Sequence, residues 1–124
     1  STAPTLAPMT AYVDGDTWTA DTAYAKTGSS VTTLTGVGTN GSRVILTLRT
    51  ATPTTKQYLL SDGHSANYNS PQQGAYIGRN GSITLTAIRD GLLTGTFSFR
   101  SIRADLSDTV DVTSGQIQNV PLTP

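Results

Sequence analysis

The chain has 124 residues, which is the size of one domain with one modest hydrophobic core. Eight basic and eight acidic side chains cancel, so no net field attracts nucleic acid or anionic lipid, and we expect no nucleic-acid partner. Cysteine is missing, which excludes disulfides, thiolate metal sites and thiol catalysis.

The composition favours strands over helices. All eight acidic residues are Asp, Glu is absent and Lys occurs twice, so the usual residues of exposed helix faces are missing. Thr makes up nearly one residue in five, and its branched Cβ suits a pleated strand. Because 35% of the residues are hydrophobic and they alternate regularly, we expect a folded all-β chain and not a disordered one.

Residues 1–8 differ in composition from the remainder. They contain Pro4 and Pro8 among small residues, a pattern typical of extended chain, and we interpret them as a linker or as a segment exchanged with another copy. Residues 9–124 form the single predicted domain. No apolar run approaches the ~20 residues of a membrane helix, so we expect no transmembrane segment. No secretion signal remains at the N-terminus, so in an exported protein it would already have been removed.

The expected strands follow from alternation of apolar and polar residues between turn signals. In chain order they cover residues 9–13, 17–20, 30–37, 43–48, 56–60, 82–88, 93–101, 109–113 and 116–120. The expected turns are Asp14-Gly15-Asp16, Asn40-Gly41, Arg79-Asn80-Gly81, Asp90-Gly91 and Ser114-Gly115. Residues 61–74 are polar and contain Pro71, so they are predicted to be a long loop interrupted at most by a short strand.

These elements predict an antiparallel β-sandwich or flattened barrel of about nine or ten short strands. Its core is expected to contain Val13, Trp18, Val44, Leu46, Leu48, Ile83, Leu85, Phe97, Phe99, Val110, Val112 and Ile117.

Two segments carry a family resemblance: Met9-Thr-Ala-Tyr-Val-Asp-Gly-Asp-Thr-Trp-Thr-Ala20 near the start, and Leu93-Thr-Gly-Thr-Phe-Ser-Phe99 with Val112-Thr-Ser-Gly-Gln-Ile-Gln-Asn-Val-Pro121 near the end. They resemble a domain family of unknown function in predicted lipoproteins of Bacteroidetes-type bacteria. In that family a linker after a lipidated Cys leads into a VDGxxWxA opening, and the domain closes on GTFSF and VTxGxIxNV motifs. The resemblance implies attachment to the cell envelope and supplies no catalytic residue. The lipidated Cys itself is absent from this chain.

Candidate catalytic and metal-binding groups are few. His64 lies in Ser61-Asp62-Gly63-His64-Ser65, but the members of a catalytic triad usually come from separate elements, so a loop histidine is the better interpretation. Asp14 and Asp16 flank a glycine as in some calcium loops, without the further ligands that an EF-hand requires. Asp105, Asp108 and Asp111 raise the same question. We predict no catalytic residue, no cofactor and no metal site, while a weak calcium site at the Asp-Gly turns stays open.

Tyrosines give the more useful functional signal. Tyr12 falls on the strand face opposite Met9, Ala11 and Val13, where an exposed aromatic ring suggests a contact. Tyr58, Tyr68 and Tyr76 lie in or near the middle segment and could form a sticky patch, stack on a sugar or cap the open end of the barrel. Leu6 is the corresponding candidate for a contact made by the N-terminal extension.

The sequence therefore predicts a non-catalytic, extracellular or outer-envelope domain with a structural or adhesive role. Residues 1–8 could add as a strand to another copy and build a filament. The alternative is a surface binding module for a glycan or a small apolar ligand. A hydrolase would need a pocket that brings His64 against a buried Asp and a hydroxyl group.

Overall fold

The computed structural model describes residues 8–38 and 41–123, and this part of the chain is all-β with one short 3-10 turn. The elements are β1 (Met9–Val13), β2 (Asp16–Thr27), β3 (Thr32–Gly38), β4 (Arg43–Leu48), β5 (Gln57–Leu59), η1 (Leu60–Asp62), β6 (Ser65–Ser70), β7 (Gly74–Arg89), β8 (Leu92–Arg103) and β9 (Thr109–Thr123). Among these residues there is no helix of the length and apolarity that a membrane crossing requires.

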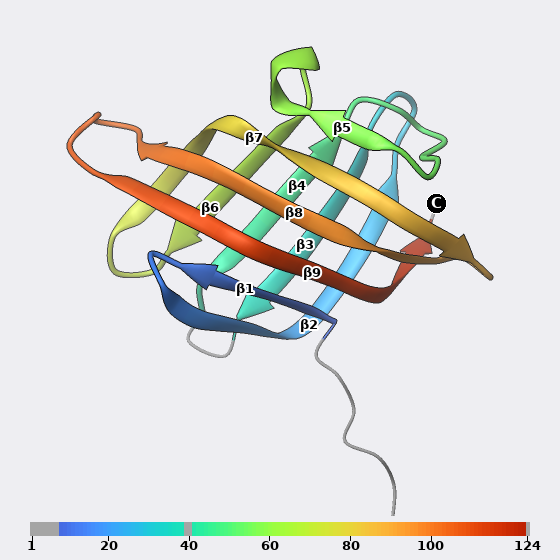
Figure 1. Ribbon diagram of the computed structural model, residues 1–124, viewed down its shortest axis with the longest axis horizontal. Coiled ribbons are helices and arrows are strands. Elements are labelled where there is room, and N and C mark those ends of the chain that lie inside the picture. Colours follow the sequence, from blue (N-terminus) through green and yellow to red (C-terminus); the bar gives the residue numbers. More distant parts are fainter. Residues whose placement is uncertain (1–7, 39–40, 124) are drawn as a thin grey trace, which may run out of the picture.

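Eight of the strands close into a barrel in the order β7-β6-β4-β3-β2-β1-β9-β8, and β8 pairs back with β7 (Figure 1). β5 is an extra strand, paired with β7 alone. The pairs are antiparallel except for a short parallel contact of Ala25 and Lys26 in β2 with Leu122 and Thr123 in β9. The predicted fold class is confirmed, in its flattened-barrel form.

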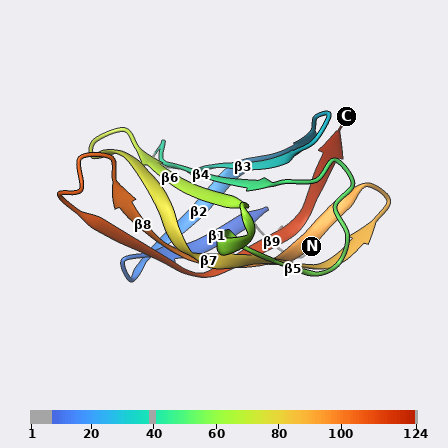
Figure 2. The ribbon, with the colours of Figure 1, turned by 90° about the horizontal axis from the view of Figure 1, so that it is seen from above.

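The barrel is flattened into two layers (Figure 2). β3 and β4 lie in one layer, β8 and β9 in the other, and the long strands β2 and β7 pass between them. β2 pairs first with β1 and later with β3 and β9, while β7 pairs with β6 along its first half and with β5 along its second. Each long strand therefore serves several neighbours and closes one side of the barrel.

Two Asp-Gly hairpins form as predicted. Asp14 and Gly15 have φ angles of 51° and 86°, and Asp90 and Gly91 have 53° and 74°. Positive φ at both central residues is the type I′ turn, whose twist matches that of the flanking strands. The pairs Val13 with Asp16 and Arg89 with Leu92 therefore face each other directly across two-residue loops. In the third expected turn, Asn40 lies outside the described residues.

Two other glycine signals were interpreted wrongly as turns. Arg79-Asn80-Gly81 lies inside β7, where Asn80 lacks the positive φ of a type I′ turn and Gly81 has a φ of 144°. Ser114-Gly115 lies inside β9, where Ser114 has a φ of 51° and the register with β8 shifts. Both sites are irregularities inside continuous strands. They therefore lengthen β7 and β9, and the described residues form nine strands.

The middle segment is more ordered than predicted. Residues 61–74 contain β6, which pairs with β4 on one side and with β7 on the other. β6 has the sequence Ser-Ala-Asn-Tyr-Asn-Ser, whose β propensity is low, and its inward residues Ala66 and Tyr68 are buried. Pairing on both edges, and not local propensity, makes this segment a strand.

The predicted core is confirmed, since all its members are buried except Val13, which is partly buried. Met9, Leu34, Tyr76, Leu93 and Val120 are further fully buried residues. Trp18 lies on Gly36, where an added Cβ would meet the indole ring, and its Nε1 donates to Ser42 Oγ at 3.1 Å. The barrel interior is a packed core, as expected for small barrels.

Leu6 and most of the proposed exchange segment lie outside the described residues. The described chain begins at Pro8, whose carbonyl oxygen accepts a hydrogen bond from the Gln118 N–H at 2.8 Å. Pro8 therefore lies beside β9.

Replacement of Gly81 by Ala should destabilise the protein far more than the same change at Gly74. Both glycines have positive φ, which costs an L-residue about 1–2 kcal/mol. A Cβ at Gly81 would also overlap the Ser98 carbonyl oxygen, whereas at Gly74 nothing lies within 4 Å. In urea unfolding we expect Gly81→Ala to lose about 2 kcal/mol more than Gly74→Ala. Equal losses would show that β7 and β8 can move apart at Gly81 at little cost in stability.

Candidate functional site

The four predicted tyrosine contacts fall into two groups. Tyr12 on β1 is 47% exposed, while Tyr58, Tyr68 and Tyr76 are 3%, 6% and 0% exposed. The last three belong to the hydrophobic core, so they do not form a patch on the surface. Their burial supports neither the sticky patch nor the stacking on a sugar, and the expectation that they cap the open end of the barrel stays a prediction.

Hydrogen bonds and ring contacts hold two of the buried tyrosines. The Tyr58 hydroxyl donates to Thr54 O and accepts from Thr54 N–H at 2.8 Å, and the Lys56 ammonium lies 5.2 Å from its ring centre. The Tyr76 hydroxyl donates to Asp108 at 2.8 Å. Burial, and then this hydrogen bond, raise the pKa of Tyr76 above its ordinary value. Both hydroxyls therefore serve the fold.

His64 has a structural role in this arrangement. Its Nδ1 accepts the Arg49 backbone N–H at 2.9 Å, and its ring meets the Tyr58 ring edge-on. Partial burial lowers the pKa of His64 below 6.5, and the nearby Asp62 opposes this shift. Its neighbour Ser61 is exposed, and so is Asp62. A hydrolase would need a buried Asp and a hydroxyl group beside His64. In the described part of the chain, the ring instead contacts the Arg49 backbone and Tyr58.

The candidate calcium ligands have separate partners. Asp14 accepts the Asp111 N–H at 2.8 Å, Asp111 pairs with Arg100 at 2.9 Å, and Asp108 accepts from Tyr76. The Ser107 hydroxyl and N–H hold the pKa of Asp105 below its ordinary value. Within residues 8–38 and 41–123, no group of three or more His, Cys, Asp or Glu side chains gathers in a way that could hold a metal ion.

The exposed ring of Tyr12 borders a hollow on the outer face of β1, β2 and β9. This hollow has a volume of about 280 Å³ and is lined by Thr10, Ala11, Tyr12, Thr17, Ser114 and Gln116. β1 pairs with β2 and with β9, which places Tyr12 opposite Thr17 on one side and Thr113 on the other. The outward residues of three strands thus form one wall of hydroxyl and amide groups beside an aromatic ring.

A second hollow of about 280 Å³ adjoins the first across β9. It shares Ser114 and Gln116 with the first hollow and continues to Ser82, Thr96 and Ser98 on β7 and β8. Gly115 allows β9 to pack closely on Phe97, because a Cβ at this position would lie only 2.5 Å from the Phe97 ring. A third hollow shares Ser98 and reaches Arg100 and Asp111, whose charges pair with each other.

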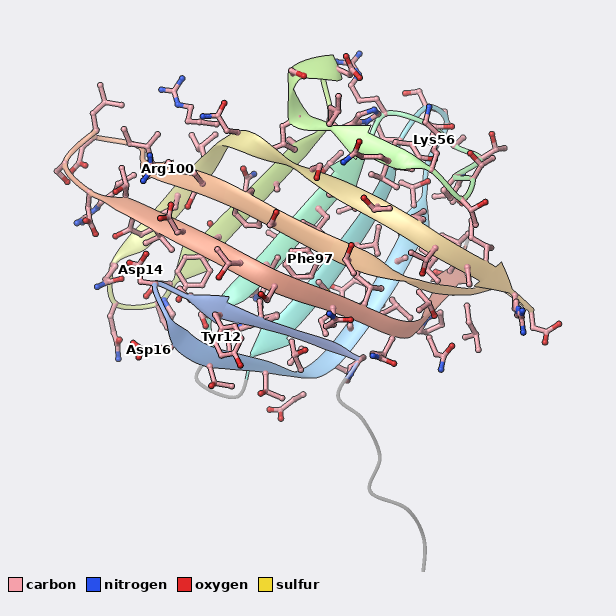
Figure 3. The ribbon with its side chains drawn as sticks, viewed as in Figure 1. Tyr12, Asp14, Asp16, Lys56, Phe97 and Arg100 are labelled. Carbon is pink, nitrogen blue, oxygen red and sulfur yellow. The ribbon has the colours of Figure 1, made fainter. Side chains whose placement is uncertain are left out.

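We call these three adjoining hollows the Tyr12 face. In Figure 3, Tyr12 on β1 and Phe97 and Arg100 on β8 mark its course across the sheet. Its donors and acceptors are mostly neutral hydroxyl and amide groups, and one half-exposed aromatic ring stands at its end. Such a surface can stack on an apolar ring face and exchange hydrogen bonds with hydroxyl groups.

Sequence reasoning found Tyr12 but missed the hollows beside it. Alternation along residues 9–13 is enough to place Tyr12 outside the core. The hollows lie beside the bulge at Ser114, where the Ser-Gly dipeptide alone predicts a turn.

Acidification should destabilise the fold through His64. Because the pKa of His64 lies below 6.5 in the fold, the unfolded chain takes up its proton first as the pH falls. Stability is then lost as the pH falls through 6.5, and the loss should be smaller in His64→Gln, which costs about 1 kcal/mol at neutral pH. Thermal unfolding of both proteins at about pH 7.5 and pH 5 measures this difference. If both proteins lost the same stability between these pH values, the prediction for His64 would be contradicted.

Comparison with known families assigns the chain. The sequence profile of a domain of unknown function, DUF6252, matches residues 7–121, which is nearly the whole chain. No curated protein and no solved structure matches it. The extent of the match agrees with the resemblance seen at both ends of the sequence. The chain therefore belongs to the DUF6252 family of domains.

Proposed function

We propose that this protein is a non-catalytic binding domain of the outer cell envelope or extracellular space, which takes a neutral glycan on the Tyr12 face. The observation that carries the proposal is the position of Tyr12. Its half-exposed ring lines one of two adjoining hollows, and these two hollows share Ser114 and Gln116. Aromatic stacking together with hydroxyl and amide hydrogen bonds is the chemistry that a sugar ring requires.

Charge supports a neutral ligand over a charged one. The chain has no net charge, and the two hollows nearest Tyr12 are lined by no charged side chain of the described residues. Where charges do line the Tyr12 face, Arg100 and Asp111 are 2.9 Å apart and neutralise each other. An anionic or cationic ligand would find no counter-charge beside Tyr12.

The expected location rests on sequence resemblance. The opening and closing motifs resemble those of lipoprotein domains in Bacteroidetes-type bacteria, and a Thr-rich chain without net charge suits an envelope domain that binds glycans and acts as an adhesin. Assembly through residues 1–8 stays a prediction. The closed barrel leaves few strand edges for it, and among the described strands β5 pairs on one side only.

A small apolar ligand inside the barrel finds less support. The interior is occupied by a single cluster of buried side chains from all nine strands, among them Trp18, Leu46, Tyr76 and Phe97. Larger barrels enclose ligand cavities, but in small ones side chains fill the interior. A ligand is therefore expected on the outer surface.

Removal of the Tyr12 ring should abolish most glycan binding. A neutral-glycan array identifies the ligand, and calorimetry then compares Tyr12→Ala with Tyr24→Ala, whose ring is 49% exposed on β2. We expect Tyr12→Ala to weaken binding about tenfold or more, as for an aromatic hot spot, and Tyr24→Ala to bind like the parent.

The melting temperatures of both variants provide the control for folding, since each ring is about half exposed. Gln116→Ala should also weaken binding, because Gln116 lines both of the hollows beside Tyr12. An array without any neutral-glycan signal, or equal losses in Tyr12→Ala and Tyr24→Ala, would reject the proposal.

A further inference from the structure

A separate hollow opens at the end of the barrel that carries the β1–β2 hairpin. It has a volume of about 210 Å³, and its lining includes Asp14, Asp16, Thr17, Trp18, Tyr68 and Gln73. Figure 3 shows the labelled Asp14 and Asp16 at this end, at the tip of β1 and the start of β2. We call it the end hollow. Since water occupies about 30 Å³ per molecule in the liquid, its size suits a small head group.

The rim of the end hollow is negatively charged. Asp14 is fixed to β9, because its N–H donates to Asp111 O and its Oδ1 accepts from Asp111 N–H, both at 2.8 Å. Asp16 is exposed, and its carboxylate makes no hydrogen bond or ion pair with the described part of the chain. None of the lining residues is Lys or Arg. Two carboxylates therefore face this hollow without a cationic partner among the described residues.

The inner wall of the end hollow is aromatic and carries an unused hydroxyl group. Tyr68 is 6% exposed, so it is more than nine-tenths buried, and its ring lies 6.0 Å from that of Tyr76. Its hydroxyl makes no hydrogen bond with the described residues, whereas those of Tyr58 and Tyr76 do. The ring is nearly buried, but the hydroxyl group itself reaches solvent, so a ligand in the hollow can contact it.

Trp18 adds a second aromatic wall. Its Nε1–H already donates to Ser42, so toward the hollow it offers carbon surface and π electrons. Carboxylates at the rim combined with aromatic rings inside are the features that attract an organic cation, through charge and through cation–π contact. A calcium ion would instead require six to eight oxygen ligands, and fewer than three carboxylate or imidazole groups gather here.

We propose that the end hollow binds an alkylammonium group. Asp14 and Asp16 balance its charge, and Tyr68 and Trp18 pack against its carbon atoms. This site is distinct from the Tyr12 face, where the hollows beside Tyr12 have no charged lining. The two regions meet at Thr17, which lines both.

The test is an NMR titration of the full chain with tetramethylammonium chloride, and with tert-butanol as a neutral probe of similar shape. We expect saturable shifts at Tyr68 and Gln73 with the cation and none with the alcohol. Shifts at Thr10 and Gln116 without shifts at Tyr68 and Gln73 would place the cation at the Tyr12 face and overturn the proposal. Because the affinity is partly electrostatic, added NaCl should weaken the binding.

A pair of variants isolates the rim charge. Asp16→Asn should weaken tetramethylammonium binding about fivefold, while Asp21→Asn, on the same strand and equally exposed, should leave it unchanged. The spectrum of each free variant reports its fold, and the salt dependence of the parent tests the charge without any substitution.

Three results would overturn the proposal: equal binding by both variants, equal binding of tert-butanol, or displacement of the cation by calcium at stoichiometric concentration. A failure here would leave the glycan result at Tyr12 untouched, because that experiment uses neutral ligands and a different face.

Discussion

Closure of the barrel is the constraint on which the remaining structure depends. A sheet that closes on itself has no long free edges, but its strands must bend and serve different neighbours along their length. β7 meets β6, β5 and β8, and it can do so because Gly81 lets its backbone pass against Ser98. Gly95 plays the same part where β8 crosses Thr84. A side chain at either place would separate the two strands.

Buried polar side chains are mostly paired, and among the described residues the buried side-chain atom without a partner is Asn67 Oδ1. Trp18 donates to Ser42, Tyr76 to Asp108 and Ser101 to the Val110 carbonyl oxygen. Each bond joins two different strands or turns, and pairing offsets most of the cost of removing the groups from water. The Tyr68 hydroxyl differs, because it reaches solvent at the end hollow, where the carboxylates of Asp14 and Asp16 have no cationic partner among the described residues.

The sequence predicts what depends on neighbours along the chain. Asp14-Gly15 and Asp90-Gly91 form the turns that their residue types favour, and the core residues selected by alternation are all buried except Val13. About half of the core lies outside that selection. Asn80-Gly81 resembles these dipeptides, yet it lies inside β7 because β8 passes over it. A local signal does not contain that information, since the same glycine can serve a turn or a close contact.

The candidate sites were only partly predictable for the same reason. Alternation puts Tyr12 on the surface. For Tyr58, Tyr68 and Tyr76 it does not determine whether the ring faces the core or solvent, because that depends on how β5, β6 and β7 pair. β6 becomes a strand through pairing on both edges, and that pairing turns Tyr68 inward. Asp14 and Tyr68 likewise line the same hollow although they are far apart in the sequence, so only the closed barrel brings them together.

The outer surfaces of the two sheet layers differ in polarity, and this difference affects which ligand each can bind. On the layer opposite the Tyr12 face, the strand register aligns one outward row, which consists of Tyr24, Thr35, Ile45, Asn67 and Ile77. That row is largely apolar, and its rings and aliphatic groups stand on a regular sheet. The Tyr12 face is instead interrupted by the bulge at Ser114, which opens hollows lined by hydroxyl and amide groups. The bulge, by breaking the regular surface, makes this layer the one that can enclose a ligand.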